Sequence, residues 1–478
     1  MTRKSFLQSM AASMAMPLLG GPARRNIVLI LSDDHSASML GCAEHPWLKT
    51  ANLDRMAQGG VHFRNAFVTT SLCSPSRASI LTGQYAHTHG VIGNEEWFAD
   101  GSVTFPELLQ RDGYRTGFVG KWHIGGDNDE PQAGFERWTA FGGQGAYIDP
   151  ELNVDGVRSQ ARGYTTDLLT EQALRFLRQP DRRPFFLMLS HKAAHNFCVP
   201  AERHRDLYKA EPIPTPQSMP DSELNYAGKP DWVRRQRRSW HGVDGMYDGQ
   251  VTFEQHYRDY CRTLMALDDS VGSVLDLLES RRQLNDALVV YMSDNGFQFG
   301  EHGLIDKRTM YEPSIRVPMI AHCPDLFAAG RQVDEMVLNL DLAPTLLEAA
   351  SLDVPGSMHG RSMLELLRGT TGWRSDFLYE YFWDRTFPQT PTVTGLRTAR
   401  YSYMRYHGVW DINELYDLQS DPGQMRNLLA DTRITTQAGP LVSNIHDQQL
   451  QNLVSSFNQR IASILDGTDA QLDADWLT

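Results

Sequence analysis

Short runs of apolar residues recur along the chain, and polar or charged side chains follow each run at once. The clearest runs cover residues 26–31, 114–119, 184–189 and 287–292. Fully apolar runs of this length are typical of parallel strands that are buried on both faces. Stretches with a helical repeat of apolar positions lie between them, chiefly at 165–178 and 257–279. This alternation predicts an α/β fold with a large, mostly parallel central sheet flanked by helices.

The pattern changes near residue 374. Short alternating strands are expected at 378–381, 394–397 and 401–406. A last amphipathic helix is expected at about 447–465. The pattern therefore predicts a small C-terminal antiparallel sheet packed with a helix. It divides the chain into a main domain at 24–373 and a C-terminal subdomain at 374–478.

The first 23 residues have the order of an export signal. The basic segment Thr2-Arg3-Lys4 precedes a short apolar run at 9–19, and Gly21-Pro22-Ala23 is a suitable cleavage site. The run is too short to span a bilayer. The segment resembles a twin-arginine signal with Lys4 in place of the second arginine, and an ordinary secretory signal is the alternative. Either signal predicts a periplasmic or secreted protein without a membrane span.

Charge and cysteine content exclude some classes of protein. The formal net charge is −13, so there is no global basic surface for nucleic acid, and an anionic substrate would need a local cationic pocket. The cysteines are Cys42, Cys73, Cys198, Cys261 and Cys323. This odd, sparse set argues against a disulfide scaffold. One pair could still form after export, and the sequence leaves that open.

Oxygen ligands follow two of the apolar runs. Asp33 and Asp34 come directly after the run at 26–31, and Asp294 and Asn295 come after the run at 287–292. Open α/β sheets bind ligands at the carboxyl ends of their strands. Carboxylate and amide oxygens suit a hard divalent cation. The sequence therefore predicts a cation site formed by these side chains, with Ca²⁺ favoured and Mg²⁺ as the alternative.

The segment Cys73-Ser74-Pro75-Ser76-Arg77, followed by Leu81-Thr82-Gly83, lies between these clusters. Residues 77–81 are expected to be helical, which places position 73 at a helix N-terminus, where the helix dipole favours anions. A cysteine nucleophile would normally need a histidine base and an oxyanion hole, without a metal. Here the pattern favours a cation site at which residue 73 completes the ligand shell.

The extended pattern C-x-P-S-R-x-x-x-L-T-G resembles the formylglycine-dependent sulfatases of the alkaline phosphatase superfamily. Other matching segments are Gly120 to Gly125, His191 to His195, Ser293 to Gly296 and Gly300 to Lys307. The resemblance covers roughly residues 26–430 and implies an alkaline-phosphatase-like fold. It is closest to bacterial glycan sulfatases related to N-acetylglucosamine-6-sulfatase and to mucin-desulfating enzymes.

The resemblance implies a reaction and assigns its residues. In the family a maturase oxidises the cysteine to formylglycine (3-oxoalanine), and one hydroxyl of the hydrated aldehyde attacks sulfur. The residues that correspond to the catalytic positions are Cys73, Arg77, Lys121, His123, His195 and Lys307. His195 would protonate the departing sugar oxygen, and His123 would help the second hydroxyl to expel sulfate. Lys121 and His123, two apart on an extended segment, are expected to point the same way.

These residues imply hydrolysis of sulfate esters on a sulfated carbohydrate. The stretch 232–241 interleaves arginine with tryptophan, which suits either an anionic sugar or a solvated surface loop. We expect Arg237, Trp240 and His302 to contact the substrate. A phosphonate or phosphate monoester hydrolase of the same superfamily is the alternative. A non-catalytic carbohydrate-binding protein is disfavoured, because every expected catalytic position is filled.

Overall fold

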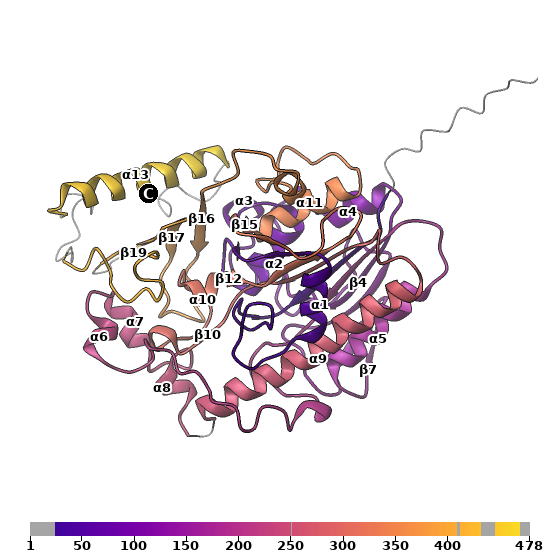
Figure 1. The fold of residues 1–478 in the computed structure, drawn as a ribbon, viewed down its shortest axis with the longest axis horizontal. Coiled ribbons are helices and arrows are strands. Elements are labelled where there is room, and N and C mark those ends of the chain that lie inside the picture. The colour runs from indigo at the N-terminus through magenta and orange to yellow at the C-terminus, as the bar shows by residue number, and fades with distance from the viewer. Residues whose placement is uncertain (1–23, 250, 409–411, 432–444, 469–478) are drawn as a thin grey trace, which may run out of the picture.

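The computed structural model describes residues 24–249, 251–408, 412–431 and 445–468 (Figure 1). The export signal expected at 1–23 lies outside the described residues. Within the described ranges, none of the helices combines the length and the apolar character needed to cross a bilayer.

A ten-stranded sheet forms the centre of the molecule, in the order β14-β2-β13-β9-β1-β8-β4-β5-β6-β7. Its central strands run parallel. They are β9 (Leu288–Ser293), β1 (Ile27–Ser32), β8 (Phe185–Ser190), β4 (Arg115–Lys121) and β5 (Arg137–Phe141). The apolar runs in the sequence form β1, β4, β8 and β9, so the expected large, mostly parallel sheet is confirmed.

The outer strands of this sheet are shorter than its central strands. They are β13 (Met319–His322), β2 (Val61–Phe63), β14 (Arg331–Val333), β6 (Glu151–Val154) and β7 (Val157–Gln160). β13 pairs antiparallel with β9, and β6 pairs antiparallel with β5. Every residue of β7 is exposed, so this strand carries no apolar run that could reveal it.

Two apolar layers cover the two faces of the sheet. Ile27, Leu29 and Leu31 of β1 belong to one layer, and Val28 and Ile30 belong to the other. The first layer includes helices α2 (Cys73–Thr82), α4 (Phe105–Arg111) and α11 (Leu342–Ala349). The second includes α1 (Ala51–Gly59), α5 (Thr165–Arg178) and α9 (Phe253–Ser280), and Figure 1 shows α5 alongside α9. Burial on both faces explains why residues 27–31 of β1 are all apolar.

The C-terminal part forms a four-stranded antiparallel sheet (Figure 1). Its strands are β16 (Asp376–Tyr381), β17 (Val393–Thr398), β18 (Tyr401–Tyr406) and β19 (Glu414–Asp417), and helix α13 (Gln448–Gly467) packs on it. The expected small sheet with a helix is confirmed. The Phe67 and Phe377 ring centroids lie 5.1 Å apart, so one apolar core continues from the large sheet into the small one.

Short elements connect these parts. The helices are α3 (Ala86–His89), α6 (Glu223–Tyr226), α7 (Asp231–Gln236), α8 (Val243–Met246), α10 (Glu312–Ile315) and α12 (Met363–Leu367). The 3-10 turns are η1 (Glu202–His204), η2 (Glu301–Gly303) and η3 (Asn339–Asp341). The remaining strands are β3 (Ala66–Phe67), β10 (Gln298–Phe299), β11 (Ile305–Asp306), β12 (Arg316–Val317) and β15 (Val337–Leu338).

Candidate active site

Three carboxylates meet at the carboxyl ends of β1 and β9. These strands pair in parallel up to Ser32 and Ser293, so the residues that follow them leave the sheet side by side. Asp33, Asp34 and Asp294 are fully buried, and oxygens of the three carboxylates lie within 4.8 Å of one another. In-register parallel pairing therefore brings together acids that are about 260 residues apart in the sequence.

Asn295 lies against the same cluster. Its Nδ2 donates a hydrogen bond to Asp34 Oδ1, and its Oδ1 is buried without a hydrogen-bond partner among the described residues. Because the two ends of an amide exchange by a half-turn, the oxygen can face the carboxylates instead. The resulting all-oxygen set fits a hard divalent cation.

Each carboxylate of the cluster has its own cationic partner. Lys307 Nζ lies 2.6 Å from Asp34 Oδ1, and Arg77 Nη2 lies 2.7 Å from Asp294 Oδ2. Lys121 Nζ donates to Asp33 Oδ2. When all three carboxyls are ionised, their charges cancel those of the three buried cations, so a sulfate ester anion would give the site a net negative charge. An added divalent cation offsets this negative charge, which matters because buried charge is costly unless it is compensated.

The carboxyl groups do not have equal acidity. The pKa of Asp34 is raised to about 8. Burial is the main cause, the charge of Asp33 contributes in the same direction, and the opposing effect of Lys307 is smaller. Burial also raises the pKa of Asp294. Burial opposes ionisation of Asp33 too, but Lys121 and its other cationic neighbours hold the pKa of this carboxyl well below its usual range. A cation within the cluster would favour the ionised form of all three groups.

Cys73 is the first residue of α2, as the sequence predicts. Its Sγ lies 3.5 Å from Asp33 Oδ1. The helix dipole of α2 favours negative charge at this position. Burial, with a further contribution from Asp33, raises the pKa of the Cys73 thiol to about 12. The unmodified thiol is therefore protonated at neutral pH and is a poor nucleophile.

The side chains of Lys121 and His123 converge, but the backbone conformation between them differs from the expected one. Lys121 ends β4, but His123 has a left-handed backbone with φ 56°, so the segment is not extended there. Gln144 joins the two side chains: its Oε1 lies 2.6 Å from Lys121 Nζ, and its Nε2 lies 3.3 Å from His123 Nε2. The expected convergence is found, whereas the extended conformation predicted for this segment is wrong.

His195 follows β8 and faces the same cluster. Its Nε2 lies 3.9 Å from Asp34 Oδ2, and its Nδ1 lies 2.7 Å from the Asn196 carbonyl oxygen. Burial, and then the charge of Lys307, hold the pKa of His195 well below its usual value, so the imidazole is neutral near pH 7. The side chain is 16% exposed, which leaves one edge accessible to a ligand.

The sequence did not reveal several polar side chains at the site. Gln144 lies in the loop after β5 and belongs to no recognised motif. His241 Nδ1 lies 3.1 Å from Asp306 Oδ2, and Asp306 Oδ1 lies 3.4 Å from Lys307 Nζ. Asp306 and Lys192 lie within the matching segments Gly300 to Lys307 and His191 to His195, and these places were the available signals. Lys192 Nζ donates to the Gln144 carbonyl oxygen at 2.9 Å, and burial lowers the pKa of Lys192 to about 8.

The three residues expected to contact the substrate have different surroundings. His302 is buried, and its ring centroid lies 3.9 Å from that of Tyr311. Arg237 is held by the Asp244 carboxylate and the Met219 carbonyl oxygen. Trp240 is 55% exposed and stacks on His241. The structure thus brings together the expected metal-binding and catalytic residues, but engages His302 and Arg237 in packing contacts.

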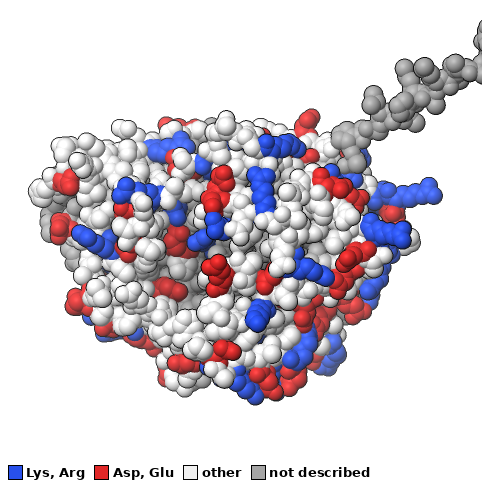
Figure 2. Space-filling model, in the orientation of Figure 1, with Lys and Arg blue, Asp and Glu red and all other residues white. Residues whose placement is uncertain are grey.

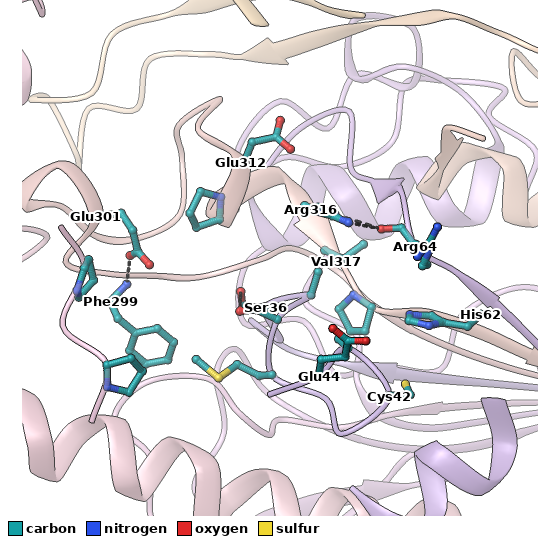
Figure 3. Close-up of a pocket in the computed structure, with 18 of the residues that line it drawn as sticks. Ser36, Cys42, Glu44, His62, Arg64, Phe299, Glu301, Glu312, Arg316 and Val317 are labelled. Atoms are coloured by element: carbon teal, nitrogen blue, oxygen red, sulfur yellow. Dashed lines mark hydrogen bonds between the residues drawn. The ribbon is translucent and has the colours of Figure 1, made fainter. Parts of the chain in front are cut away.

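A separate cavity of about 550 Å³ is lined in part by Ser36, two residues after Asp34 in the chain (Figure 3). Its lining includes Ser36, Glu44, His62, Arg64, Glu301 and Arg316 and none of the residues expected to be catalytic. Arg316 donates to the Arg64 carbonyl oxygen at 3.1 Å, and Glu301 accepts from the Phe299 amide at 2.7 Å. Arg316 and Glu301 are thus engaged within the protein, and no residue expected to be catalytic lines the cavity, so we assign the chemistry to the strand-end cluster.

The cationic groups of the site are not part of a basic surface. On the face shown in Figure 2, basic and acidic side chains are interspersed. Arg77, Lys121 and Lys307 are at most 3% exposed. An anionic group would therefore meet its positive charge inside the site.

Comparisons with known proteins match most of the chain. Residues 25–352 match the Sulfatase family, and residues 300–452 match the C-terminal region of N-sulphoglucosamine sulphohydrolase. An N-acetylglucosamine-6-O-sulfatase of Bacteroides thetaiotaomicron is 31% identical over 92% of this chain and 89% of its own. N-acetylglucosamine-6-sulfatase of Homo sapiens is 30% identical over 85% of this chain and 81% of its own. A solved complex of a protein with its substrate D-glucosamine-2-N,6-O-disulfate has a TM-score of 0.83 and 28% identity, and covers 95% of this chain and 99% of that one.

Proposed function

The chain belongs to the sulfatase family and is a sulfuric ester hydrolase, and on this premise we propose that it releases inorganic sulfate from a sulfated carbohydrate. One observation carries this proposal: Arg77, Lys121 and Lys307 converge on the buried carboxylate cluster beside Cys73. A sulfate ester is an anion that repels nucleophiles, so its hydrolysis requires positive charge around the sulfur. The two relatives named as N-acetylglucosamine-6-sulfatases support a sulfated amino sugar as substrate.

We propose Ca²⁺, with Mg²⁺ as the alternative, as the ion held by Asp33, Asp34, Asp294 and Asn295, with residue 73 completing the shell. The all-oxygen donors and the unpartnered Asn295 Oδ1 support this assignment. The bound ion would supply a Lewis acid that polarises the sulfate oxygens.

We also propose that a maturase converts Cys73 to formylglycine, and the high pKa of its buried thiol supports the need for conversion. When formed, the hydrated aldehyde would supply two hydroxyls, one for attack on sulfur and one for release of sulfate, and the second is absent from cysteine and from serine. Arg77, Lys121 and Lys307 orient the sulfate oxygens. The charge of a bound sulfate raises the pKa of His195, which can then pass a proton to the departing sugar oxygen. His123, neutral because burial and Lys121 lower its pKa, accepts a proton.

The alternative, a phosphonate or phosphate monoester hydrolase, has less support, since both curated relatives described above are named as sulfatases. The two activities are separated by comparing kcat/KM on sulfate and phosphonate esters of one alcohol. A preference for the phosphonate would favour the alternative.

Two proposals concern organisation and location. We propose a catalytic domain at 24–373 and a C-terminal subdomain at 374–478, since the strands of the small antiparallel sheet begin at Asp376. We propose that residues 1–23 direct the protein to the periplasm or outside the cell. The order of basic, apolar and small residues in this segment supports export.

The test is free sulfate release from defined saccharides by protein that has been co-expressed with a formylglycine-generating maturase. The panel contains 6-sulfated N-acetylglucosamine and sulfated galactose, fucose and uronic acids, with Cys73→Ala as the control variant. Mass spectrometry measures formylglycine at position 73. We expect release from the 6-sulfated amino sugar and none with Cys73→Ala. No release by converted protein, together with turnover of phosphonate esters, would replace the proposal by its alternative.

A further inference from the structure

Exposed aromatic side chains gather on the loops around the candidate active site. In the described part of the chain, the tryptophan, phenylalanine and tyrosine side chains that are largely exposed are Trp97 (55%), Phe197 (59%), Trp240 (55%) and Trp383 (47%). Single exposed apolar residues are ordinary on protein surfaces. Here Phe197 lies two residues after His195, and the other three belong to segments that contact site loops. We call these four residues the aromatic rim.

Trp97 is held rigidly against the loop that carries His123. The Gly125 amide donates to the Glu96 carbonyl oxygen, and the Gly126 amide donates to the Asn94 carbonyl oxygen, both at 3.0 Å. The indole covers Gly125 so closely that a Cβ at this glycine would collide with the ring. The exposure of Trp97 is therefore a property of a fixed surface and not of a loose loop.

The same segment is also tied to the nucleophile turn. Asn94 Oδ1 accepts a hydrogen bond from the Ser74 amide at 3.2 Å, next to Cys73. Residues 94–97 thus bridge the first turn of α2 and the loop after Lys121. A sugar ring beside the reacting sulfate ester would lie within reach of this bridge.

Trp240 lies next to a different segment of the site. Its ring centroid is 3.5 Å from that of His241, whose carbonyl oxygen accepts from the Ile305 amide, two residues before Lys307. Trp97 contacts the loop after β4, whereas Trp240 packs on His241, which contacts the segment that follows β9. In the sheet order, β9 and β4 lie on opposite sides of the β1–β8 pair. The two indoles therefore belong to loops that contact segments from different strand ends of the site.

The charges beside the two indoles differ in sign. Glu95 and Glu96 are exposed next to Trp97, and Arg238 is exposed near Trp240. Acidic side chains next to Trp97 disfavour a sulfated or carboxylated ring there, because like charges repel. The apolar CH face of a pyranose ring, by contrast, packs well on an indole.

We propose that the enzyme acts on an oligosaccharide or longer glycan and that Trp97 stacks on a neutral or amine-bearing sugar next to the sulfated ring. This proposal rests on the proposed sulfatase function. It adds a neighbouring ring to the substrate and a specificity-determining residue to the site.

The test compares kcat/KM on 6-sulfated N-acetylglucosamine with kcat/KM on a trisaccharide in which neutral sugars flank the same sulfated ring. We expect wild-type protein to favour the trisaccharide by about tenfold, and Trp97→Ala to lose most of this preference. Trp97→Phe should retain much of it, since the aromatic face remains. Val157→Ala, which removes an exposed apolar side chain from the outermost strand β7, is the matched control.

Binding gives a second readout that needs no turnover. Calorimetry with Cys73→Ala should show a trisaccharide Kd about tenfold higher once Trp97→Ala is added. A uronic acid in place of the neutral neighbour should also weaken binding, and Glu95→Gln with Glu96→Gln should reduce that penalty. An equal trisaccharide preference in wild-type protein and Trp97→Ala, or no preference in wild-type protein, would overturn the proposal. Lack of sulfate release from every substrate would instead overturn the sulfatase function, while the binding experiment would still test Trp97.

Discussion

The floor and the aromatic rim of the candidate active site differ in how they are held. The floor consists of the three ion pairs Asp33–Lys121, Asp34–Lys307 and Asp294–Arg77, all buried between strand ends. The rim consists of half-exposed rings on loops. Buried ion pairs tolerate little change, because removal of one partner leaves an uncompensated charge. Loops on a rigid sheet can change without loss of the fold, so the floor would serve sulfate chemistry in general and the rim the choice of sugar.

The largest expected effect is at the nucleophile. Cys73→Ala should lower kcat/KM by about 10⁴-fold or more on every sulfate ester, because the reacting group is lost. Cys73→Ser should instead release one equivalent of desulfated sugar and retain the sulfate as a stable ester. Mass spectrometry of the intact variant detects this sulfo-enzyme. Sustained turnover by Cys73→Ser at a rate near wild type would contradict the formylglycine proposal.

His195 lies between the floor and the rim. The loss of kcat in His195→Ala should depend on the leaving group of the substrate. His195→Ala should lower kcat by about 10²- to 10⁴-fold on a sugar sulfate, because the departing alkoxide needs a proton. The loss should be much smaller on an aryl sulfate, since a phenolate leaves without protonation. His62→Ala, at a buried histidine of the separate cavity, is the control. Equal losses on both substrates would assign His195 to binding or structure.

Removal of the cation should affect the floor of the site directly. A chelator should abolish activity and lower Tm, because an ion that binds only the folded state stabilises it by about 2.7 kcal/mol at a hundredfold excess over Kd. Ca²⁺ should restore both properties better than Mg²⁺. Thermal melts and sulfate release in metal-free buffer measure these effects. Full activity in protein shown by elemental analysis to be free of metal would refute the cation site.

The smallest expected effect is at the rim. Trp240→Ala should raise KM about tenfold on a sulfated oligosaccharide with little change in kcat, as expected for loss of a contact made equally in the ground and transition states. Arg237→Ala should lower Tm rather than raise KM, because its guanidinium holds Asp244 and the Met219 carbonyl oxygen. If Trp240→Ala lowered kcat and left KM unchanged, Trp240 would act through Lys307 rather than through the sugar.

Much of the site could be predicted because its signals are local in the sequence. Asp33 and Asp34 directly follow an apolar run, and Cys73 directly precedes a helical segment, so their places at a strand end and a helix start require no long-range information. His302 and Arg237 also lie in suggestive segments, but their contacts with Tyr311 and Asp244 depend on how distant loops pack. A motif can identify the type of residue that chemistry needs, whereas the direction of a loop side chain depends on its neighbours.

The sequence by itself determined the parallel sheet and the places of the carboxylates at its strand ends, because apolar periodicity and motif spacing are properties of neighbouring residues. Only the tertiary structure decided which cation pairs with which carboxylate, how Gln144 joins Lys121 to His123, and that Trp97 covers Gly125. These arrangements depend on the strand order β9-β1-β8-β4, which brings together segments far apart in the chain. Hydrogen bonding and packing between strands set this order, and no short stretch of sequence contains it.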